Sequence, residues 1–125
     1  MMKDIKRIYN FEEIKHMVDV APEFFPLDQE MLDAFFMCLI DGFCYAGIKK
    51  IHNHPSIAVV EIISDRSAKK TLQPSLFVIL LSLVKSLGFS RMSMRFKNER
   101  IKHICLKKGW VVPWGLGLYV NKESV

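Results

Sequence analysis

Apolar residues recur at helical spacing in the stretch that follows Pro74. They lie mostly three or four positions apart, at Leu76, Ile79, Leu80, Leu83, Val84 and Leu87. This spacing predicts a helix from Pro74 to Leu87 with one wide apolar face. Gly88 follows directly, and glycine readily takes the left-handed conformation at which many helices end.

The segment before this helix, Ser56 to Ile63, is almost entirely apolar and predicts a buried strand. Glu61 is its one charged residue. A polar loop, Ser64 to Gln73, then leads into the helix. The first N–H groups of a helix lack intrahelical acceptors and its dipole is positive there, so a strand, loop and helix in this order commonly hold a phosphate. The loop contains three basic residues but no glycine. Those basic residues are Arg66, Lys69 and Lys70.

The dipeptide Asp41-Gly42 predicts a tight turn between two apolar segments. Asp-Gly is a strong hairpin signal when β-prone residues flank it on both sides. The segments 35–40 and 43–51 meet that condition and are expected to pair as a hairpin. As an alternative, residues 35–40 extend the helix that precedes them.

Weaker patterns complete the element order. Before the hairpin they predict a strand and two helices, Lys6–Asn10, Glu12–Val20 and Asp28–Ala34, with Asp28 as an N-cap. After Gly88 they predict a strand, a helix and two strands, at 91–96, 98–109, 110–112 and 116–120, with a bend at 113–115. Methionine, phenylalanine and polar residues alternate at 91–96, which predicts a half-exposed strand. The order β-α-α-β-β-β-α-β-α-β-β describes an α/β fold, a mixed sheet flanked by helices.

Length and charge restrict the class of protein. The 125 residues are enough for one domain, 1–125, with a sizeable core. Eighteen basic against 13 acidic residues give a formal charge of +5, which suits an anionic ligand and equally an ordinary basic surface. The longest apolar run, Leu76 to Leu83, is too short to span a bilayer, and the N-terminus lacks the apolar core of a signal peptide.

Cysteine and histidine positions predict a reduced cytoplasmic protein without a metal site. Cys38, Cys44 and Cys105 are widely spaced and lack zinc-ligand spacing. His52 and His54 lie two positions apart with no third ligand nearby, so a solvated turn is expected at 52–55.

Three landmarks together resemble the GNAT superfamily of N-acetyltransferases, as does the order of elements. Asn98 to Trp110 has asparagine, glycine and an aromatic residue at the offsets of the family segment N-x-x-A-x-x-L-Y-x-K-x-G-F. Asp41-Gly42 with Gly47 is similar to the family's hairpin pattern. Thr71 lies 17 residues before Gly88, where the family has the first glycine of its pyrophosphate loop.

The resemblance implies acetyl-CoA as a substrate and a set of residues that hold it. Backbone groups of Ile62 and Ile63 are expected to hold the pantetheine and thioester. Pyrophosphate contacts are expected from the loop and from the start of the following helices, at Lys69, Lys70, Thr71, Gln73 and Asn98. Thr71 and Gln73 stand where glycines are usual, which restricts the access of phosphates to the backbone amides. The charges of Lys69 and Lys70 and the amides after Pro74 are expected to compensate for this restriction.

The resemblance also implies two catalytic groups, Glu61 as the general base for an amine and Cys105 as the proton donor to the leaving thiolate. Each has an alternative interpretation. Glu61 can face solvent or pair with Arg91 or Arg95, and Cys105 can be a small buried apolar residue. The main hypothesis is an N-acetyltransferase that acts by direct attack of a small-molecule or protein amine.

Two further hypotheses concern other classes of protein. The unusual loop suits a GNAT-fold protein without catalytic activity that serves as a binding or structural protein. Such a protein would be similar to the small divergent family members of tailed phages, and its expected location would be the host cytoplasm. A basic cluster alternatively suits nucleic-acid binding, although no nucleic-acid motif is present. That cluster consists of Arg91, Arg95, Lys97, Arg100, Lys102, Lys107 and Lys108.

Overall fold

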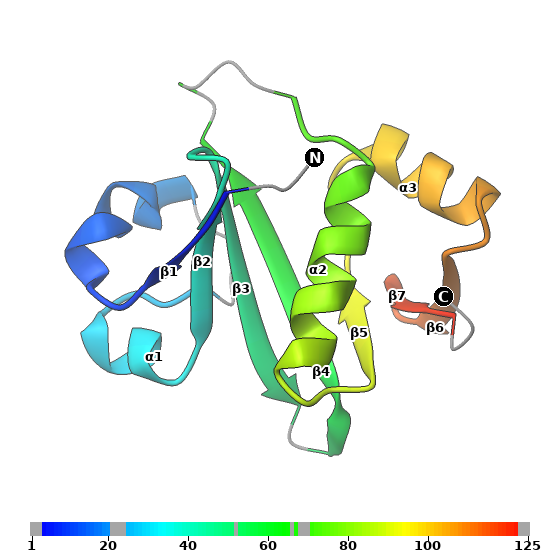
Figure 1. The fold of residues 1–125 in the computed structure, drawn as a ribbon, viewed down its shortest axis with the longest axis horizontal. Coiled ribbons are helices and arrows are strands. Elements are labelled where there is room, and N and C mark those ends of the chain that lie inside the picture. The colour runs from blue at the N-terminus through cyan, green and yellow to red at the C-terminus, as the bar shows by residue number, and fades with distance from the viewer. Residues whose placement is uncertain (1–3, 21–24, 52, 66, 68–70, 123–125) are drawn as a thin grey trace. The chain divides into compact units, whose positions relative to one another are not determined.

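The computed structural model describes residues 4–20, 25–51, 53–65, 67 and 71–122. Its strands form one mixed sheet in the order β1-β2-β3-β4-β5-β7-β6, with the helices α1, α2 and α3 between strands along the chain (Figure 1). The predicted α/β class with a mixed sheet is confirmed. The chain divides into two compact units: an N-terminal unit, Met1–Lys49 with Val60–Thr71, and a C-terminal unit, Lys50–Val59 with Leu72–Val125.

The N-terminal unit begins with three antiparallel strands. β1 (Ile5–Ile8) pairs with β2 (Phe36–Ile40), and β2 pairs with β3 (Cys44–Ile51). Asp41 and Gly42 both have positive φ angles, 54° and 76°, and the Phe43 amide donates to the Ile40 carbonyl across the turn. Two central residues with positive φ suit the right-handed twist of the flanking strands. The predicted hairpin is therefore confirmed, and the alternative helix extension is wrong.

The predicted helix Glu12–Val20 is wrong in type. The structure has two 3₁₀ segments instead, Phe11–Glu13 and Lys15–Val20, and the Asn10 side chain caps the first by accepting from the Glu12 amide. The buried residues Ile14 and Met17 lie three positions apart. Side chains at i and i+3 eclipse one another in a 3₁₀ helix, so this spacing suits three residues per turn.

Helix α1 (Gln29–Asp33) begins where its cap was predicted. The Asp28 carboxylate accepts from the Met31 amide at 2.8 Å. α1 contributes Leu32 to a core whose members come from every part of this unit. The buried members are Ile8, Ile14, Met17, Phe25, Leu32, Phe35, Met37 and Tyr45, with Ile63 packed against them.

Gly47 on β3 leaves room for this core. A Cβ at Gly47 would lie 2.9 Å from Met37 Sδ and 3.6 Å from the Phe25 ring. Real Cβ atoms do not approach other heavy atoms that closely, so a side chain at position 47 would require the buried Met37 side chain to shift. The second glycine of the Asp41-Gly42 and Gly47 pattern thus has a physical cause in this chain.

In the C-terminal unit, the start of β4 (His54–Ser64) pairs in parallel with β5 (Arg91–Met94) through Ile57–Arg91, Ala58–Met92 and Val59–Ser93. Helix α2 (Ser75–Ser86) packs along β5 (Figure 1), with Leu76, Leu80 and Val84 buried. This matches the predicted helix to within one residue at each end. β4 is longer than predicted, because His54 and Pro55 belong to the strand and not to a turn.

The strand predicted at 91–96 is present as β5, which ends at Met94, but the prediction that it is half-exposed is wrong at Ser93. β5 lies between β4 and β7 in the sheet, and Met92, Ser93 and Met94 are all buried. Buried Ser93 donates from its hydroxyl to the Ala58 carbonyl at 3.3 Å. The alternation of apolar and polar residues therefore reflects a satisfied buried hydroxyl and not a solvated face.

Helix α3 (Glu99–Lys107) leads to the hairpin of β6 (Val111–Gly115) and β7 (Leu118–Asn121). The bend predicted at 113–115 is wrong, because these residues belong to β6 and the chain turns at Leu116 and Gly117. Gly115, Leu116 and Gly117 all have positive φ. Pro113 is tolerated because β6 is the last strand in the sheet order, where one edge needs no ladder hydrogen bonds.

Candidate active site

The second half of β4 belongs to the N-terminal unit and carries three of the predicted site residues. Glu61 is buried, with 8% of its surface exposed, and Ile62 and Ile63 are half-buried. Successive residues of a strand point to opposite faces, so Glu61 and Ile63 share one face. Ile63 packs against the core cluster that contains Tyr45, which identifies that face as the one covered by the 3₁₀ segments and α1. The roles of Glu61, Ile62 and Ile63 stay predictions.

The predicted pyrophosphate loop lies only partly within the described residues, and Lys69 and Lys70 fall outside them. Thr71 and Gln73 are both exposed. The Gln73 and Pro74 carbonyls accept from the Leu76 and Phe77 amides, each at 3.0 Å. Two amides at the start of α2 are therefore engaged within the first turn, and Pro74 itself has no N–H.

Arg100 stabilises the segment that leads into α2. Its Nη2 donates to the Leu72 carbonyl at 2.8 Å, across 28 residues of sequence. The first turn of α3 thus places a guanidinium group beside the residues that precede α2. Sequence reasoning placed Arg100 only in the basic cluster and missed this contact, because no local pattern relates positions 72 and 100.

Asn98 and Cys105 both have structural roles at α3. The Asn98 Oδ1 accepts from the Ile101 amide at 3.1 Å, which confirms the predicted N-cap; a contact with a coenzyme stays a prediction. The Cys105 side chain is fully buried, and burial raises the pKa of its thiol while Lys108 lowers it. Burial favours the packing interpretation of Cys105, and its role as a proton donor stays a prediction.

His16 and Tyr45 form a pair that no sequence pattern predicted. The Tyr45 hydroxyl lies 3.4 Å from His16 Nε2, and the two rings meet edge to face with centroids 5.9 Å apart. Tyr45 is 6% exposed, whereas His16 is exposed. Burial raises the pKa of Tyr45, and the carboxylates of Asp65 and Glu13 raise it further.

Asp65 follows β4 and lies close to this pair. Hydrogen bonds from the Ser67 hydroxyl at 2.6 Å and the Ser67 amide at 3.0 Å lower the pKa of Asp65, and the His16 imidazole lowers it further. The Asp65 amide donates to the Phe43 carbonyl at 2.7 Å, which joins the end of β4 to the start of β3. A tyrosine and a histidine from two elements therefore meet within the N-terminal unit, and the Asp65 carboxylate acts on both through its charge.

Charge is distributed unevenly between the two units. The C-terminal unit contains ten basic and two acidic residues, a formal charge of +8. The N-terminal unit contains eight basic and eleven acidic residues, a formal charge of −3. The modest net charge of the chain therefore conceals one strongly basic and one mildly acidic unit.

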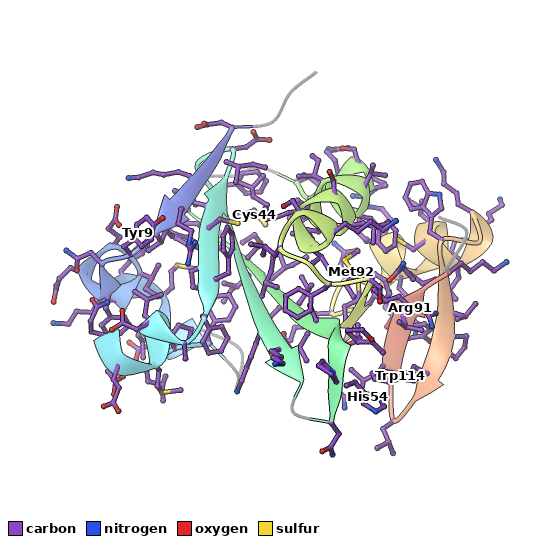
Figure 2. The ribbon with its side chains drawn as sticks, turned by 60° about the horizontal axis from the view of Figure 1, so that its bottom comes forward. Tyr9, Cys44, His54, Arg91, Met92 and Trp114 are labelled. Atoms are coloured by element: carbon purple, nitrogen blue, oxygen red, sulfur yellow. The ribbon has the colours of Figure 1, made fainter. Side chains whose placement is uncertain are left out.

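The arginines of the basic cluster donate hydrogen bonds to backbone carbonyls within the C-terminal unit. Arg91 donates to the Asn121 carbonyl through Nε at 3.1 Å and Nη2 at 2.7 Å, and Arg95 donates to the Leu116 carbonyl. Figure 2 shows Arg91 and Met92 as neighbours on β5. These contacts stabilise the β6–β7 hairpin.

Exposed aromatic and apolar side chains lie on β6 and its turn. Trp114 is 37% exposed and meets His54 edge to face, with centroids 5.4 Å apart (Figure 2). Leu116 is 90% exposed at the turn itself. His54, expected in a solvated turn, therefore has an aromatic neighbour.

Within the described residues, no group of three or more His, Cys, Asp or Glu side chains is arranged to hold a metal ion. No helix among those residues is long and apolar enough to cross a bilayer. The three cysteines are free thiols, and all are buried.

Solved structures that share this fold include acetyltransferases. No family model matches the sequence, and no curated protein matches it by sequence comparison. A spermidine N-acetyltransferase chimera from Vibrio cholerae and a second protein superposes with a TM-score of 0.68 at 11% identity, covering 99% of this chain and 97% of its own. The GNAT-family acetyltransferase of Streptococcus pneumoniae gives 0.56 at 14% identity, with 96% of each chain covered.

A GNAT-family acetyltransferase of Staphylococcus aureus gives a TM-score of 0.55 at 9% identity, covering 98% of this chain and 99% of its own. At such low identities the likeness is one of fold. The chain has the GNAT fold along almost its whole length, which confirms the fold that the sequence resemblance predicted.

Proposed function

We propose that this protein is an N-acetyltransferase that moves an acetyl group from acetyl-CoA to an amine by direct attack. The GNAT fold supports the class of reaction. The observation that carries the proposal is the Arg100 guanidinium, whose Nη2 lies 2.8 Å from the Leu72 carbonyl in the segment that leads into α2. Coenzyme A is a polyanion, and a cation at this position suits its phosphates.

Residues at the start of α2 and α3 fit the phosphates of coenzyme A by chemistry. Arg100 provides a fork of N–H donors that suits phosphate oxygens, and it already lies at the Leu72 carbonyl. Exposed Thr71 and Gln73 add polar groups in the same segment. Lys69, Lys70 and Asn98 complete the predicted set. Because glycines are replaced at positions 71 and 73, the cationic groups of Arg100, Lys69 and Lys70 are proposed to provide much of what backbone amides provide in a glycine-rich loop.

The chemistry needs one base and one acid. The amine loses a proton to a base on the protein, for which the GNAT resemblance indicates Glu61, or to water. Its nitrogen lone pair then forms a bond to the thioester carbonyl carbon, the carbon–sulfur bond breaks, and the sulfur leaves as a thiolate. Cys105 or water provides the proton that the thiolate takes up.

Thermal unfolding with acetyl-CoA tests donor binding directly. A ligand at a hundred times its Kd adds about 2.7 kcal/mol to the free energy of unfolding. Unchanged unfolding at millimolar acetyl-CoA would refute the proposal and would leave two hypotheses, a non-catalytic GNAT-fold protein and a nucleic-acid-binding protein. Release of free thiol from acetyl-CoA with spermidine, putrescine or a lysine peptide then identifies the class of acceptor.

The loop variants Thr71→Gly and Gln73→Gly sharpen this test. Both changes open the backbone to phosphate, so each is expected to increase the stabilisation by acetyl-CoA. A weaker shift in both variants would show that the polar side chains, and not the backbone, bind the donor. Salt-dependent binding to DNA or RNA, lost in Arg95→Ala and Arg100→Ala, would favour the nucleic-acid hypothesis instead.

A further inference from the structure

We propose that His16 receives the proton of the acceptor ammonium ion and that Tyr45 positions the His16 imidazole for this step. The inference rests on the proposed acetyl transfer and names a residue that the GNAT resemblance does not assign. It stands on a contact between two side chains 29 positions apart, from a 3₁₀ segment and from β3.

The exposure of the pair suits proton transfer. Tyr45 is buried and fixed by the core cluster, whereas His16 is exposed to the solvent from which an amine arrives. Glu61 is 8% exposed, so a proton accepted there has a longer way to solvent. Histidine changes charge between about pH 5 and 8, which allows one side chain to take up a proton and release it.

The tautomer of His16 decides which ring nitrogen acts. When Nε2 carries the hydrogen, it donates to the Tyr45 oxygen at a heavy-atom distance of 3.4 Å, and Nδ1 carries the lone pair that accepts the proton. Such contacts are often long before substrate binds. The amine N–H bond breaks, its proton moves to Nδ1, and the electron pair stays on the nitrogen that attacks the thioester carbon. The imidazolium then releases its proton to water.

The surrounding charges favour a cationic acceptor. Hydrogen bonds from Ser67 lower the pKa of Asp65, which follows β4, and the charge of His16 lowers it further, so the Asp65 carboxylate is ionised beside this pair. Glu13, on the first 3₁₀ segment, raises the pKa of Tyr45 through its charge, and its Oε1 lies 3.0 Å from Lys6 Nζ. Ile63 packs on the same core as Tyr45, and Asp65 follows it by two residues, so the pair lies beside the end of β4 that is predicted to hold the thioester.

The variant His16→Gln tests the inference through the pH dependence of kcat/KM. In the wild type, kcat/KM for spermidine is expected to rise as His16 loses its proton. In His16→Gln this His16 limb of the pH profile disappears, and only the limb due to deprotonation of the amine remains. At pH 7, kcat/KM is expected to fall about 100-fold. Lys15→Gln removes a neighbouring exposed charge from the same 3₁₀ segment and is expected to leave the profile unchanged.

Tyr45→Phe separates positioning from structure. Losing this hydrogen bond leaves the imidazole less well oriented, so kcat is expected to fall severalfold with KM little changed, while the His16 limb of the pH profile remains. The same variant is expected to change the imidazole resonances of His16 in NMR spectra, where the resonance absent from His16→Gln identifies His16. A limb that is lost in Glu61→Gln but unchanged in His16→Gln would overturn the inference.

A second readout distinguishes this inference from the proposed function. If the wild type neither binds acetyl-CoA nor releases thiol, acetyl transfer fails as the function. NMR spectra recorded with spermidine and coenzyme A then test amine recognition by His16 and Tyr45 alone, through the His16 imidazole resonance. A shift in that resonance supports recognition of the amine, and no shift in either the wild type or Tyr45→Phe overturns it.

Discussion

Replacing Arg100 by glutamine removes the guanidinium that lies beside the segment before α2. The side chain is exposed, so the folded protein loses little besides the 2.8 Å contact with the Leu72 carbonyl. A hydrogen bond to a charged group contributes about 1.5–3 kcal/mol, and a loss of about 1.4 kcal/mol raises Kd tenfold. Arg100→Gln is therefore expected to weaken acetyl-CoA binding by at least about tenfold.

Thermal unfolding converts this loss into a temperature. At a concentration one hundred times the wild-type Kd, the ligand stabilises the wild type by about 2.7 kcal/mol and a variant with tenfold weaker binding by about 1.4 kcal/mol. A chain of 125 residues has an unfolding entropy of about 0.26 kcal/mol/K, so the expected rises in Tm are about 10 °C and about 5 °C. Differential scanning fluorimetry resolves this difference.

Lys107→Gln is the matched control. It removes the same charge from the same helix, about 10 Å further along α3. It is expected to keep the full wild-type shift. An equal shift in Arg100→Gln and the wild type would refute the role of Arg100, and an equal reduction in both variants would show that only the net charge of the unit matters.

Three further predictions concern stability. Asn121→Ala leaves the buried Met92 amide without the 2.8 Å acceptor that Asn121 Oδ1 provides, at a cost of about 1–3 kcal/mol in urea unfolding; an unchanged midpoint would contradict this. Gly47→Val forces side-chain atoms against Met37 Sδ, 2.9 Å from the ideal Cβ, and is expected to cost about 1–3 kcal/mol by overpacking, with wild-type stability as the refuting result. Burial raises the pKa of Cys44 from 9.0 to about 12, so the folded state keeps a proton that the unfolded state loses. The contribution of this thiol to the free energy of unfolding is therefore fully present below pH 9 and falls above pH 9 by about 1.4 kcal/mol per pH unit. The free energy of unfolding of Cys44→Ala should fall less steeply with pH, and equal slopes in the variant and the wild type would contradict this prediction.

Local patterns were sufficient for the elements whose cause is local. The periodicity after Pro74 predicted α2 because burial along a single helix repeats every 3.6 residues. Asp41-Gly42 predicted the hairpin because positive φ angles are a property of those residues themselves. Asp28 and Asn98 predicted helix starts because a side-chain cap acts within three residues.

Predictions failed where burial depends on a distant neighbour. Ser93 lies on a strand with an exposed pattern, yet β5 is enclosed between β4 and β7, which only the strand order decides. The 3₁₀ segments likewise follow from packing onto the core cluster, since the apolar spacing at 14, 17 and 18 also suits an α-helix.

The sequence by itself determined the fold class, the landmarks of the GNAT fold and the anomaly of a phosphate loop without glycine, because these depend on residue types at short separations. The tertiary structure decided which residues meet. It joined His16 to Tyr45 across 29 positions and Arg100 to Leu72 across 28, and it divided an overall charge of +5 into a basic and an acidic unit. Contacts of this kind arise from the path of the backbone through the sheet, and no pattern along the chain encodes them locally.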